Sequence, residues 1–314
     1  MNSITLSLNV VFPMVALISV GYILKLIKMI DDHALTVMNK IAFRVFISSM
    51  LFVNIYKFNL DTILKKENFK LISFVVICVV LEIIGGFIIF KKITTDPRKF
   101  PVMIQGIFRT NLILFGIAIT QALYNGSAGV TSLLAAVMVP IFNIIAVIML
   151  EVYRGGKINH SKIVKGIIKN PLVLAALLAC PFVITGIRLP LAIIKPIESL
   201  SSIATPLSFI ILGGTLKFDN LLNNMKYLLS VNIARLIILP IIFMILAIKI
   251  GFRNEALIGI FGVLGTPTAV SSFNMAKEMG ADGDLAGEIV VTTSAVSFIT
   301  TFLWIIFLKN FNLI

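Results

Sequence analysis

Gly265-Thr266-Pro267 interrupts an apolar segment at residues 256–279, and Arg109-Thr110-Asn111 interrupts another at residues 100–124. Lipid offers no hydrogen-bond partner to free backbone N–H and C=O groups, so a broken span is tolerated only where the loosened backbone faces protein or a water-filled cavity. Paired breaks at corresponding positions in two halves of a chain are typical of a transporter's binding site. The two interruptions therefore predict a binding site inside a membrane.

The composition also indicates a membrane protein. Hydrophobic residues make up 59% of the 314 residues, charged residues make up 13%, and the mean hydropathy is +1.06. A helix needs roughly 20 apolar residues to cross a bilayer. Ten apolar segments approach that length, at residues 4–26, 35–56, 69–90, 100–124, 130–152, 171–187, 200–216, 227–248, 256–279 and 285–308. We therefore predict an all-α membrane protein with ten transmembrane helices, of which the fourth and ninth are broken.

The net charge of +13 comes from Lys and Arg residues that are spread over short loops rather than clustered on one face. With the N-terminus outside, the cytoplasmic loops and their flanks hold 15 of these residues and the opposite side holds 9. This distribution follows the positive-inside rule. We expect a protein of the cell membrane with both termini outside, which contacts the lipid bilayer and a small solute but no nucleic acid.

The most basic loop divides the ten spans into two groups of five. Because five is odd, the second group enters the membrane from the opposite side, which makes the groups an inverted repeat. In each group the fourth span is broken and leads through a short Gly-containing loop into a long fifth span. We expect a first repeat at residues 1–153, a short basic cytoplasmic linker at residues 154–169 and a second repeat at residues 170–314.

Three ionisable side chains lie near the middle of predicted spans, where each costs on the order of several kcal/mol. They are Glu82 in the third span, Arg109 in the fourth and Arg235 in the eighth. The third and eighth spans are counterparts in the repeat, so Glu82 and Arg235 are candidates for a buried ion pair with either a structural or a coupling role. That pairing would leave Arg109 as an unmatched positive charge. Glu288 lies near the end of its span and is expected at the interface.

An anion would satisfy the positive charge at the first break. The residues after each break begin a new half-helix, whose free N–H groups and positive dipole end favour negative groups. Pro267 suits such a start because it lacks the N–H that a first helical turn leaves unbonded. Hydroxyl and amide groups nearby can orient a carboxylate, although each one alone is more typical of helix packing. The candidate substrate-binding residues are Arg109, Thr110, Asn111, Gly265, Thr266, Pro267, Thr268 and Ser271.

No catalytic or metal-binding pattern accompanies these residues. His33 and His160 lie in loops, neither HExxH nor GxSxG occurs, and the acidic residues at 278–288 surround a single turn. Cys78 and Cys180 lie in separate spans without a CxxC motif, as core residues do. We expect no enzyme activity, no metal site and no cofactor.

The residues that follow the second break form a recognisable signature. They read Pro267-Thr268-Ala269-Val270-Ser271-Ser272, then Met275-Ala276-Lys277-Glu278-Met279-Gly280, then a helix with Thr292-Thr293-Ser294-Ala295-Val296-Ser297. Near the first break, Asn111 is followed by Leu112 and by Phe115-Gly116. These motifs resemble those of the auxin efflux carrier family, whose prokaryotic members include malate and malonate permease-like proteins.

This resemblance implies two inverted five-helix repeats whose fourth and ninth helices cross at their breaks, beside the substrate. It also implies a scaffold of helices 1, 2, 6 and 7, often the surface of a homodimer, and a moving transport unit of helices 3–5 and 8–10. Two family prolines are missing: none occurs between Pro101 and Pro140, and the second span reads Ile47-Ser48-Ser49-Met50. Arg109 matches no general family motif and indicates a substrate preference of this chain.

Together these features favour a secondary transporter of a small organic anion, a carboxylate, that works by alternating access at the crossing. Arg109 would supply charge, while Asn111 and residues 266–272 would supply hydrogen bonds. One alternative is a cation-coupled transporter or cation/proton antiporter of the same architecture, and another is a membrane receptor without transport. The crossing carries Arg109 and no Asp or Glu, which counts against the cation-coupled alternative.

Overall fold

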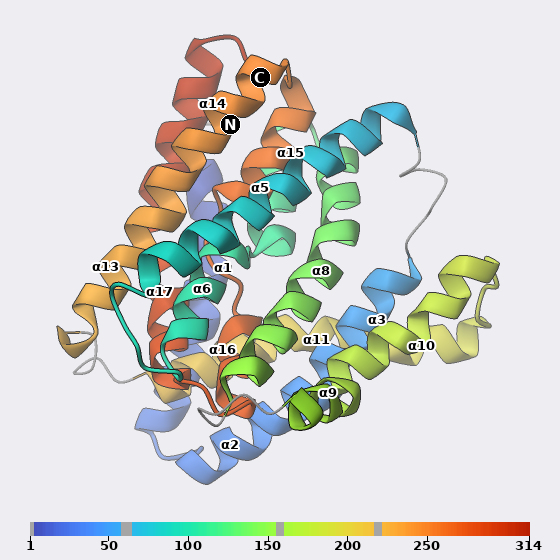
Figure 1. Ribbon diagram of the computed structural model, residues 1–314, viewed down its shortest axis with the longest axis vertical. Helices are drawn as coiled ribbons and strands as arrows, with labels where there is room; N and C mark the ends of the chain where they lie inside the picture. The colour runs from blue at the N-terminus through green and yellow to red at the C-terminus, as the bar shows by residue number, and fades with distance from the viewer. Residues whose placement is uncertain (1–2, 58–64, 155–159, 217–221) are drawn as a thin grey trace.

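A computed structural model describes residues 3–57, 65–154, 160–216 and 222–314 (Figure 1). Within these ranges the chain is helical and forms no strand apart from one isolated bridge. The helices are α1 (Ser3–Leu26), α2 (Asp32–Ile41), η1 (Ala42–Ile47), α3 (Ser48–Tyr56), α5 (Lys66–Phe90), α6 (Phe100–Phe108), η2 (Leu112–Ile117), α7 (Ala118–Leu123), α8 (Gly129–Tyr153), α9 (His160–Lys169), α10 (Pro171–Thr185), α11 (Leu191–Thr215), α13 (Met225–Ile233), η3 (Ala234–Ile238), α14 (Leu239–Ile250), α15 (Asn254–Leu264), α16 (Ser271–Glu278) and α17 (Gly283–Asn310). The three η elements are π-helical turns inside longer helices. The all-α class predicted from the sequence is confirmed.

Six helices are long and apolar enough to cross a membrane. They are Asp32–Tyr56, Lys66–Phe90, Gly129–Tyr153, Leu191–Thr215, Met225–Ile250 and Gly283–Asn310. Shorter apolar helices cover Phe12–Leu26, Leu112–Leu123, Pro171–Thr185 and Asn254–Leu264. The short ones include the segments that the breaks cut, because a break divides a membrane-length run into two pieces.

Two predicted boundaries differ from the structure. The seventh span was expected to begin at residue 200, but α11 begins at Leu191. Lys195 and Glu198 lower the hydropathy of its first turns without breaking the helix, and Glu198 pairs with Lys57 at 2.7 Å. The expected linker is partly helical, since α9 occupies its second half, whereas residues 155–159 lie outside the described residues.

The helices pack in two groups. In the first, α11 packs against α1, α2, η1 and α3, and α10 packs against α3, beside which it lies in Figure 1. In the second, α15 packs against α5, α8, α14 and η2, while α17 packs against α6, α13 and α16. The groups meet where α1 packs against α17 and α7, where α3 and α10 pack against α8, and where η1 and α11 pack against α16. This arrangement leaves the two broken segments in the second group, facing the first.

The two breaks lie against each other in the middle of the protein. The Asn111 N–H donates to the Pro267 carbonyl oxygen at 2.9 Å, and the Ala269 N–H donates to the Arg109 carbonyl oxygen at 3.0 Å. These two bonds make Thr110 and Thr268 a single antiparallel bridge. Each break therefore supplies hydrogen-bond partners that the other lacks, which lets irregular backbone exist at this depth.

A glycine pair lets the two broken segments approach closely beside the bridge. A Cβ at Gly262 of α15 would lie 3.1 Å from the Gly116 Cα of η2, and a Cβ at Gly116 would lie 3.2 Å from the Gly262 Cα. Neither position has room for a side chain unless a backbone moves. Small residues at such contacts are typical of helices that associate inside membranes.

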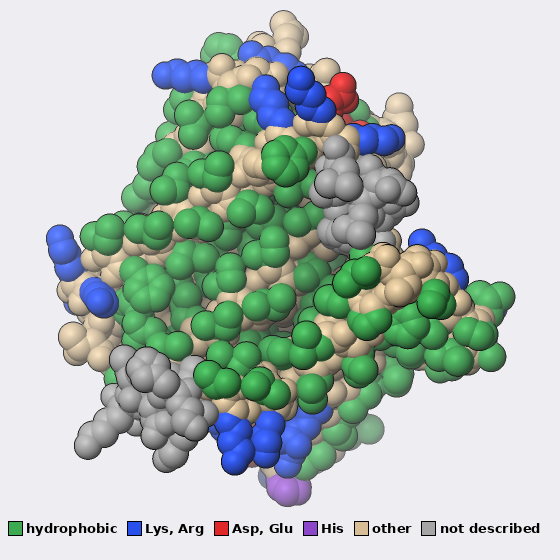
Figure 2. All heavy atoms as spheres, turned by 45° about the vertical axis from the view of Figure 1, so that its right-hand side comes forward, with side chains coloured by type: hydrophobic (Ala, Val, Ile, Leu, Met, Phe, Trp, Pro, Cys, Tyr) green, Lys and Arg blue, Asp and Glu red, His purple; other side chains and the backbone are tan. Residues whose placement is uncertain are grey.

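The outer surface has the polarity of a bilayer-facing protein. Figure 2 shows hydrophobic side chains across the middle of one face, with most of the visible Lys and Arg side chains above and below them. Exposed hydrophobic residues on α5 include Ile77, Ile84 and Ile88. An apolar band bounded by basic residues fits the hydrocarbon core and the flanking interfaces of a membrane.

Candidate functional site

The half-helices that follow the two breaks begin with unbonded N–H groups. η2 begins at Leu112 and continues into α7, and α16 begins at Ser271. Among the described residues, no group accepts a hydrogen bond from the backbone N–H of Leu112, Ile113, Val270 or Ser271. Free N–H groups and the positive end of the helix dipole make a helix start favourable for a negative group. Both breaks therefore present the electrostatics of an anion site.

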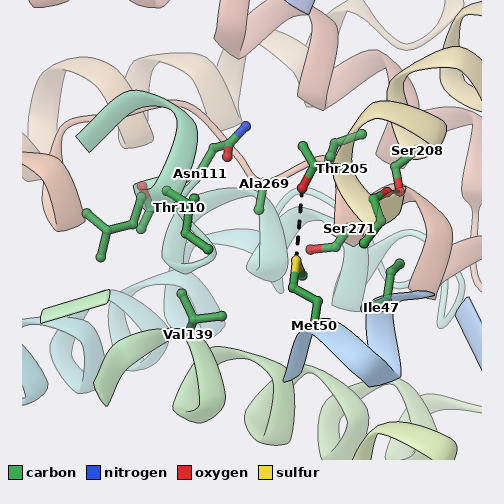
Figure 3. Close-up of a pocket in the computed structure, with 13 residues that line it drawn as sticks. Ile47, Met50, Thr110, Asn111, Val139, Thr205, Ser208, Ala269 and Ser271 are labelled. Atoms are coloured by element: carbon green, nitrogen blue, oxygen red, sulfur yellow. Dashed lines mark hydrogen bonds between the residues drawn. The ribbon is translucent and has the colours of Figure 1, made fainter. Parts of the chain in front are cut away.

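A pocket lies at these two helix starts, where the crossing faces α3 and α11 (Figure 3). Its cavity volume is about 40 Å³, so the pocket is nearly closed in this structure. The lining residues are Ile47, Met50, Thr110, Asn111, Leu112, Ile113, Val139, Ala204, Thr205, Ser208, Ala269, Val270 and Ser271. Both groups of helices and both breaks contribute to its wall. Mostly apolar walls with a few converging polar groups are typical of small-molecule sites.

Two side chains of the breaks offer hydrogen-bond donors at this pocket. The Asn111 Nδ2 is buried and has no partner among the described residues, although the side chain lines the pocket. The Ser271 Oγ accepts a hydrogen bond from Arg109 Nη2 at 2.8 Å, which leaves its own proton free to donate. An unpaired buried donor costs about 1–3 kcal/mol. A ligand with negative oxygen atoms would remove that cost.

Arg109 lies behind Ser271 and does not line the pocket. The side chain is 2% exposed, and its guanidinium donates to Gln105 Oε1 at 3.1 Å, Met275 Sδ at 2.9 Å and Asn143 Oδ1 at 2.8 Å. No carboxylate of the described residues lies within 4.0 Å of it. The positive charge therefore reaches the pocket through the Ser271 hydroxyl, which it orients and polarises.

The other candidate residues hold the crossing together. The Thr266 hydroxyl donates to the Gly262 carbonyl oxygen at 2.7 Å, and the Thr110 hydroxyl lies 3.2 Å from the same oxygen and contacts the Thr266 hydroxyl. The Thr268 Oγ1 donates to the Gly106 carbonyl oxygen at 2.7 Å. Gly265 has no room for a Cβ beside the Phe261 ring, and Pro267 accepts the backbone bond described above. Of the eight candidates, the pocket brings together Thr110, Asn111 and Ser271.

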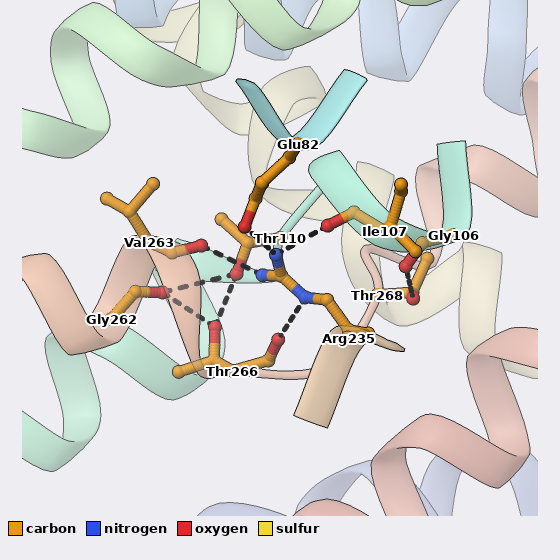
Figure 4. Close-up of polar contacts among 9 residues, drawn as sticks. All are labelled: Glu82, Gly106, Ile107, Thr110, Arg235, Gly262, Val263, Thr266 and Thr268. Atoms are coloured by element: carbon orange, nitrogen blue, oxygen red, sulfur yellow. Dashed lines mark hydrogen bonds and ion pairs between the residues drawn. The ribbon is translucent and has the colours of Figure 1, made fainter. Parts of the chain in front are cut away.

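Glu82 and Arg235 lie together on the opposite side of the bridge (Figure 4). The Arg235 Nη1 is 3.7 Å from the Glu82 Oε1, and both side chains are fully buried. Arg235 donates to three backbone carbonyl oxygens, those of Thr266 at 2.9 Å, Ile107 at 2.7 Å and Val263 at 2.8 Å. Neither carboxylate oxygen of Glu82 accepts a hydrogen bond within the described residues. The guanidinium therefore joins the C-terminal ends of α6 and α15, the half-helices that precede the two breaks.

Sequence reasoning missed the wall that α3 and α11 supply. Thr205 and Ser208 of α11 line the pocket opposite the breaks, and Thr205 donates to Met50 Sδ at 3.9 Å. The sequence did contain an indication of this wall, because hydroxyl residues three or four apart in an apolar helix lie on one face of that helix. Glu288, which we expected near the interface, is 2% exposed and accepts a hydrogen bond from Asn224 Nδ2 at 2.8 Å.

Comparisons with known proteins point to transport. The profile of a family described as membrane transport protein matches residues 6–305. An uncharacterized transporter of Methanothermobacter thermautotrophicus is 24% identical over 302 residues, which cover 95% of this chain and 97% of the relative. An uncharacterized transporter of Methanocaldococcus jannaschii is 24% identical over 308 residues, which cover 94% of each chain. The similarity therefore extends over both breaks and over the helices that carry the pocket.

Proposed function

Since this chain belongs to the membrane transport protein family, as the auxin efflux carrier-like motifs predicted, we propose that it is a secondary transporter of a small organic anion. The anion is a carboxylate that binds in the pocket at the crossing of the two breaks. The protein acts by alternating access and performs no chemical reaction on its substrate. The family is one of membrane transporters rather than of enzymes.

The pocket's set of donors is the observation that supports an anion. The Asn111 amide, the Ser271 hydroxyl and the unbonded N–H groups of two helix starts all line it. None of the described residues that line the pocket is acidic, and Arg109 adds a full positive charge behind Ser271. The apolar residues among them, such as Leu112 and Val139, fit a carbon skeleton better than a hydrated inorganic ion.

The position of the pocket supports a moving transport unit. Met50, Thr205 and Ser208 come from the proposed scaffold of α1, α2 to α3, α10 and α11, while the break residues come from the remaining helices. A substrate held between two such groups changes sides when one group moves against the other. Below the crossing, Asn274 of α16 donates to Asn39 Oδ1 of α2 at 2.8 Å, so this polar contact must part during the movement.

The proposed architecture follows the sequence repeat. Residues 1–153 and 170–314 form two inverted five-helix repeats, joined by the basic linker at residues 154–169. The protein lies in the cell membrane with both termini outside, and the scaffold face joins two copies into a homodimer. Both broken helices then take equivalent places in their repeats, which accounts for the symmetric pairing of their backbones.

Transport by the purified protein in liposomes tests the proposal. Radiolabelled dicarboxylates are supplied outside, and uptake is compared among the native protein, Ser271→Ala and Asn111→Ala. Ser202→Ala is a matched control because Ser202 is exposed on α11 and outside the pocket. We expect saturable uptake by the native protein and the control, and weaker apparent affinity in the two pocket variants.

Two results would overturn the proposal in different ways. Absence of flux for every carboxylate tested, together with ligand-induced stabilisation of the protein, would indicate a receptor instead of a transporter. Flux that is unchanged in both pocket variants would place the substrate elsewhere in the protein. Dependence of flux on a sodium or proton gradient would show coupling to a cation.

A further inference from the structure

The carbonyl ends of two half-helices converge on one point next to the breaks. α6 ends at Phe108 and α15 ends at Leu264, and both helices end with their negative dipole ends at the crossing. The carbonyl oxygens of Ile107, Val263 and Thr266 face the same point (Figure 4). In transporters with broken helices, such half-helix ends and unwound carbonyls coordinate a coupling cation.

In this protein the point is occupied by the Arg235 guanidinium. Each of its three nitrogen atoms donates to a different one of the three carbonyl oxygens, at 2.7–2.9 Å. The Glu82 carboxyl group lies 3.7 Å from the guanidinium, within ion-pair distance. Arg235 extends from η3, a π-helical turn in the middle of the eighth predicted span. A covalently attached cation therefore lies where a free one would be coordinated.

The surrounding groups fit a cation of any kind, and not only an arginine. Backbone carbonyl and carboxylate oxygens are the ligands that hard cations prefer. All the groups that face the guanidinium within hydrogen-bond or ion-pair distance are of these two types in the described part of the chain. Glu82 accepts no hydrogen bond there, so its position does not depend on the shape of a guanidinium.

We propose that Arg235 is a tethered cation that fills a cation site at the crossing, so that the native protein binds no free alkali cation there. Replacing the guanidinium by a neutral group opens this site to a free monovalent cation, either Na⁺ or guanidinium itself. The inference goes beyond the proposed anion transport, since neither the pocket nor the substrate enters it. A purely structural arginine would instead leave a defect that no particular cation repairs.

Thermal unfolding of purified protein in different chloride salts tests the proposal. The variants are Arg235→Gln, which is neutral, Arg235→Lys, which keeps a charge, and Arg235→Gln combined with Glu82→Gln. The control is Arg253→Gln, because Arg253 also donates to carbonyl oxygens at a helix end, those of Ile248 at 2.8 Å and Phe252 at 2.7 Å. Arg253 is partly exposed, so water can replace its guanidinium.

We expect the Tm of Arg235→Gln to rise by about 2–4 °C when choline is replaced by about 0.1 M Na⁺ or guanidinium, because a cation that binds only the folded state stabilises it. The native protein, Arg235→Lys and the Arg253→Gln control should show no such difference. Adding Glu82→Gln should abolish the response, since the site then lacks its negative charge.

Equal Tm values of Arg235→Gln in every salt would overturn the proposal, and so would an equal response of Arg235→Lys. If Arg235→Gln does not fold in any salt, Arg235→Lys decides the outcome. A folded lysine variant supports a requirement for positive charge at this point, whereas failure of both variants contradicts it. Because these measurements contain no organic anion, their outcome is independent of the proposed transport.

Discussion

Removal of the Ser271 hydroxyl isolates the contribution of one donor to anion binding. In Ser271→Ala the pocket loses the O–H that Arg109 orients through its 2.8 Å hydrogen bond. A hydrogen bond to a charged group contributes about 1.5–3 kcal/mol. Since about 1.4 kcal/mol corresponds to tenfold in affinity, the anion should bind about 10- to 100-fold more weakly. The maximal rate should change less than the affinity.

The fold should survive this substitution. Arg109 keeps its hydrogen bonds to Gln105, Asn143 and Met275, so its guanidinium stays held by three side chains. We expect the free energy of unfolding to fall by only about 1 kcal/mol, the net value of one hydrogen bond. A decrease in Tm of only about 2–4 °C together with weakened binding would separate a binding role from a structural one.

The assay is uptake of labelled carboxylate into liposomes as a function of its concentration. Ser271→Thr keeps the hydroxyl and should retain most of the affinity, whereas the exposed control Ser202→Ala should match the native protein. An apparent affinity of Ser271→Ala within about twofold of native, which is under about 0.5 kcal/mol, would refute the role of this hydroxyl.

Three further predictions concern the pocket, the glycine contact and the contact between Asn39 and Asn274. Asn111→Asp replaces an unpaired donor by a negative charge at the pocket and should abolish anion uptake, which liposome assays would detect; undiminished uptake would exclude an anion beside this residue. Gly262→Ala brings a Cβ within 3.1 Å of backbone and should cost about 1–3 kcal/mol, measured as a lower Tm, whereas Gly85→Ala, with nothing within 4 Å of its Cβ, should not be destabilised. Asn39→Ala and Asn274→Ala should show a coupling of about 0.6–1.7 kcal/mol in a double-mutant cycle of stability, and strictly additive effects would contradict the direct amide contact.

The breaks could be predicted from the sequence because polar residues and a proline interrupt membrane-length apolar runs. Their meeting point required the family resemblance, since hydropathy says nothing about which irregular segments supply partners for each other. Thr110 and Thr268 form the bridge through backbone atoms, which their side-chain types do not reveal. Sequence reasoning was therefore sound on where regular structure ends and weaker on how the ends are satisfied.

The roles of buried polar side chains were also hard to predict, because the sequence does not show which groups supply their hydrogen-bond partners. Arg109 and Arg235 both lie near mid-span, and either could have faced a ligand. In the structure Arg109 is buried behind Ser271, whereas Arg235 is surrounded by backbone carbonyl oxygens. Every residue has a backbone carbonyl group, so the sequence gives no sign of such partners. Thr205 was overlooked because a threonine in an apolar helix can bond to its own helix backbone or face a pocket, and the residue type is the same in both cases.

Protection of a cysteine in the pocket tests most directly whether the anion binds at the crossing. Thr205→Cys is prepared with Cys180→Ser, since Cys78 is buried and Cys180 is exposed. The rate of maleimide labelling is measured with increasing carboxylate, and Ser202→Cys in the same background is the control. We expect a transported carboxylate to slow labelling at position 205 in a saturable manner and to leave the control unchanged. A transported carboxylate that leaves both rates unchanged would contradict it.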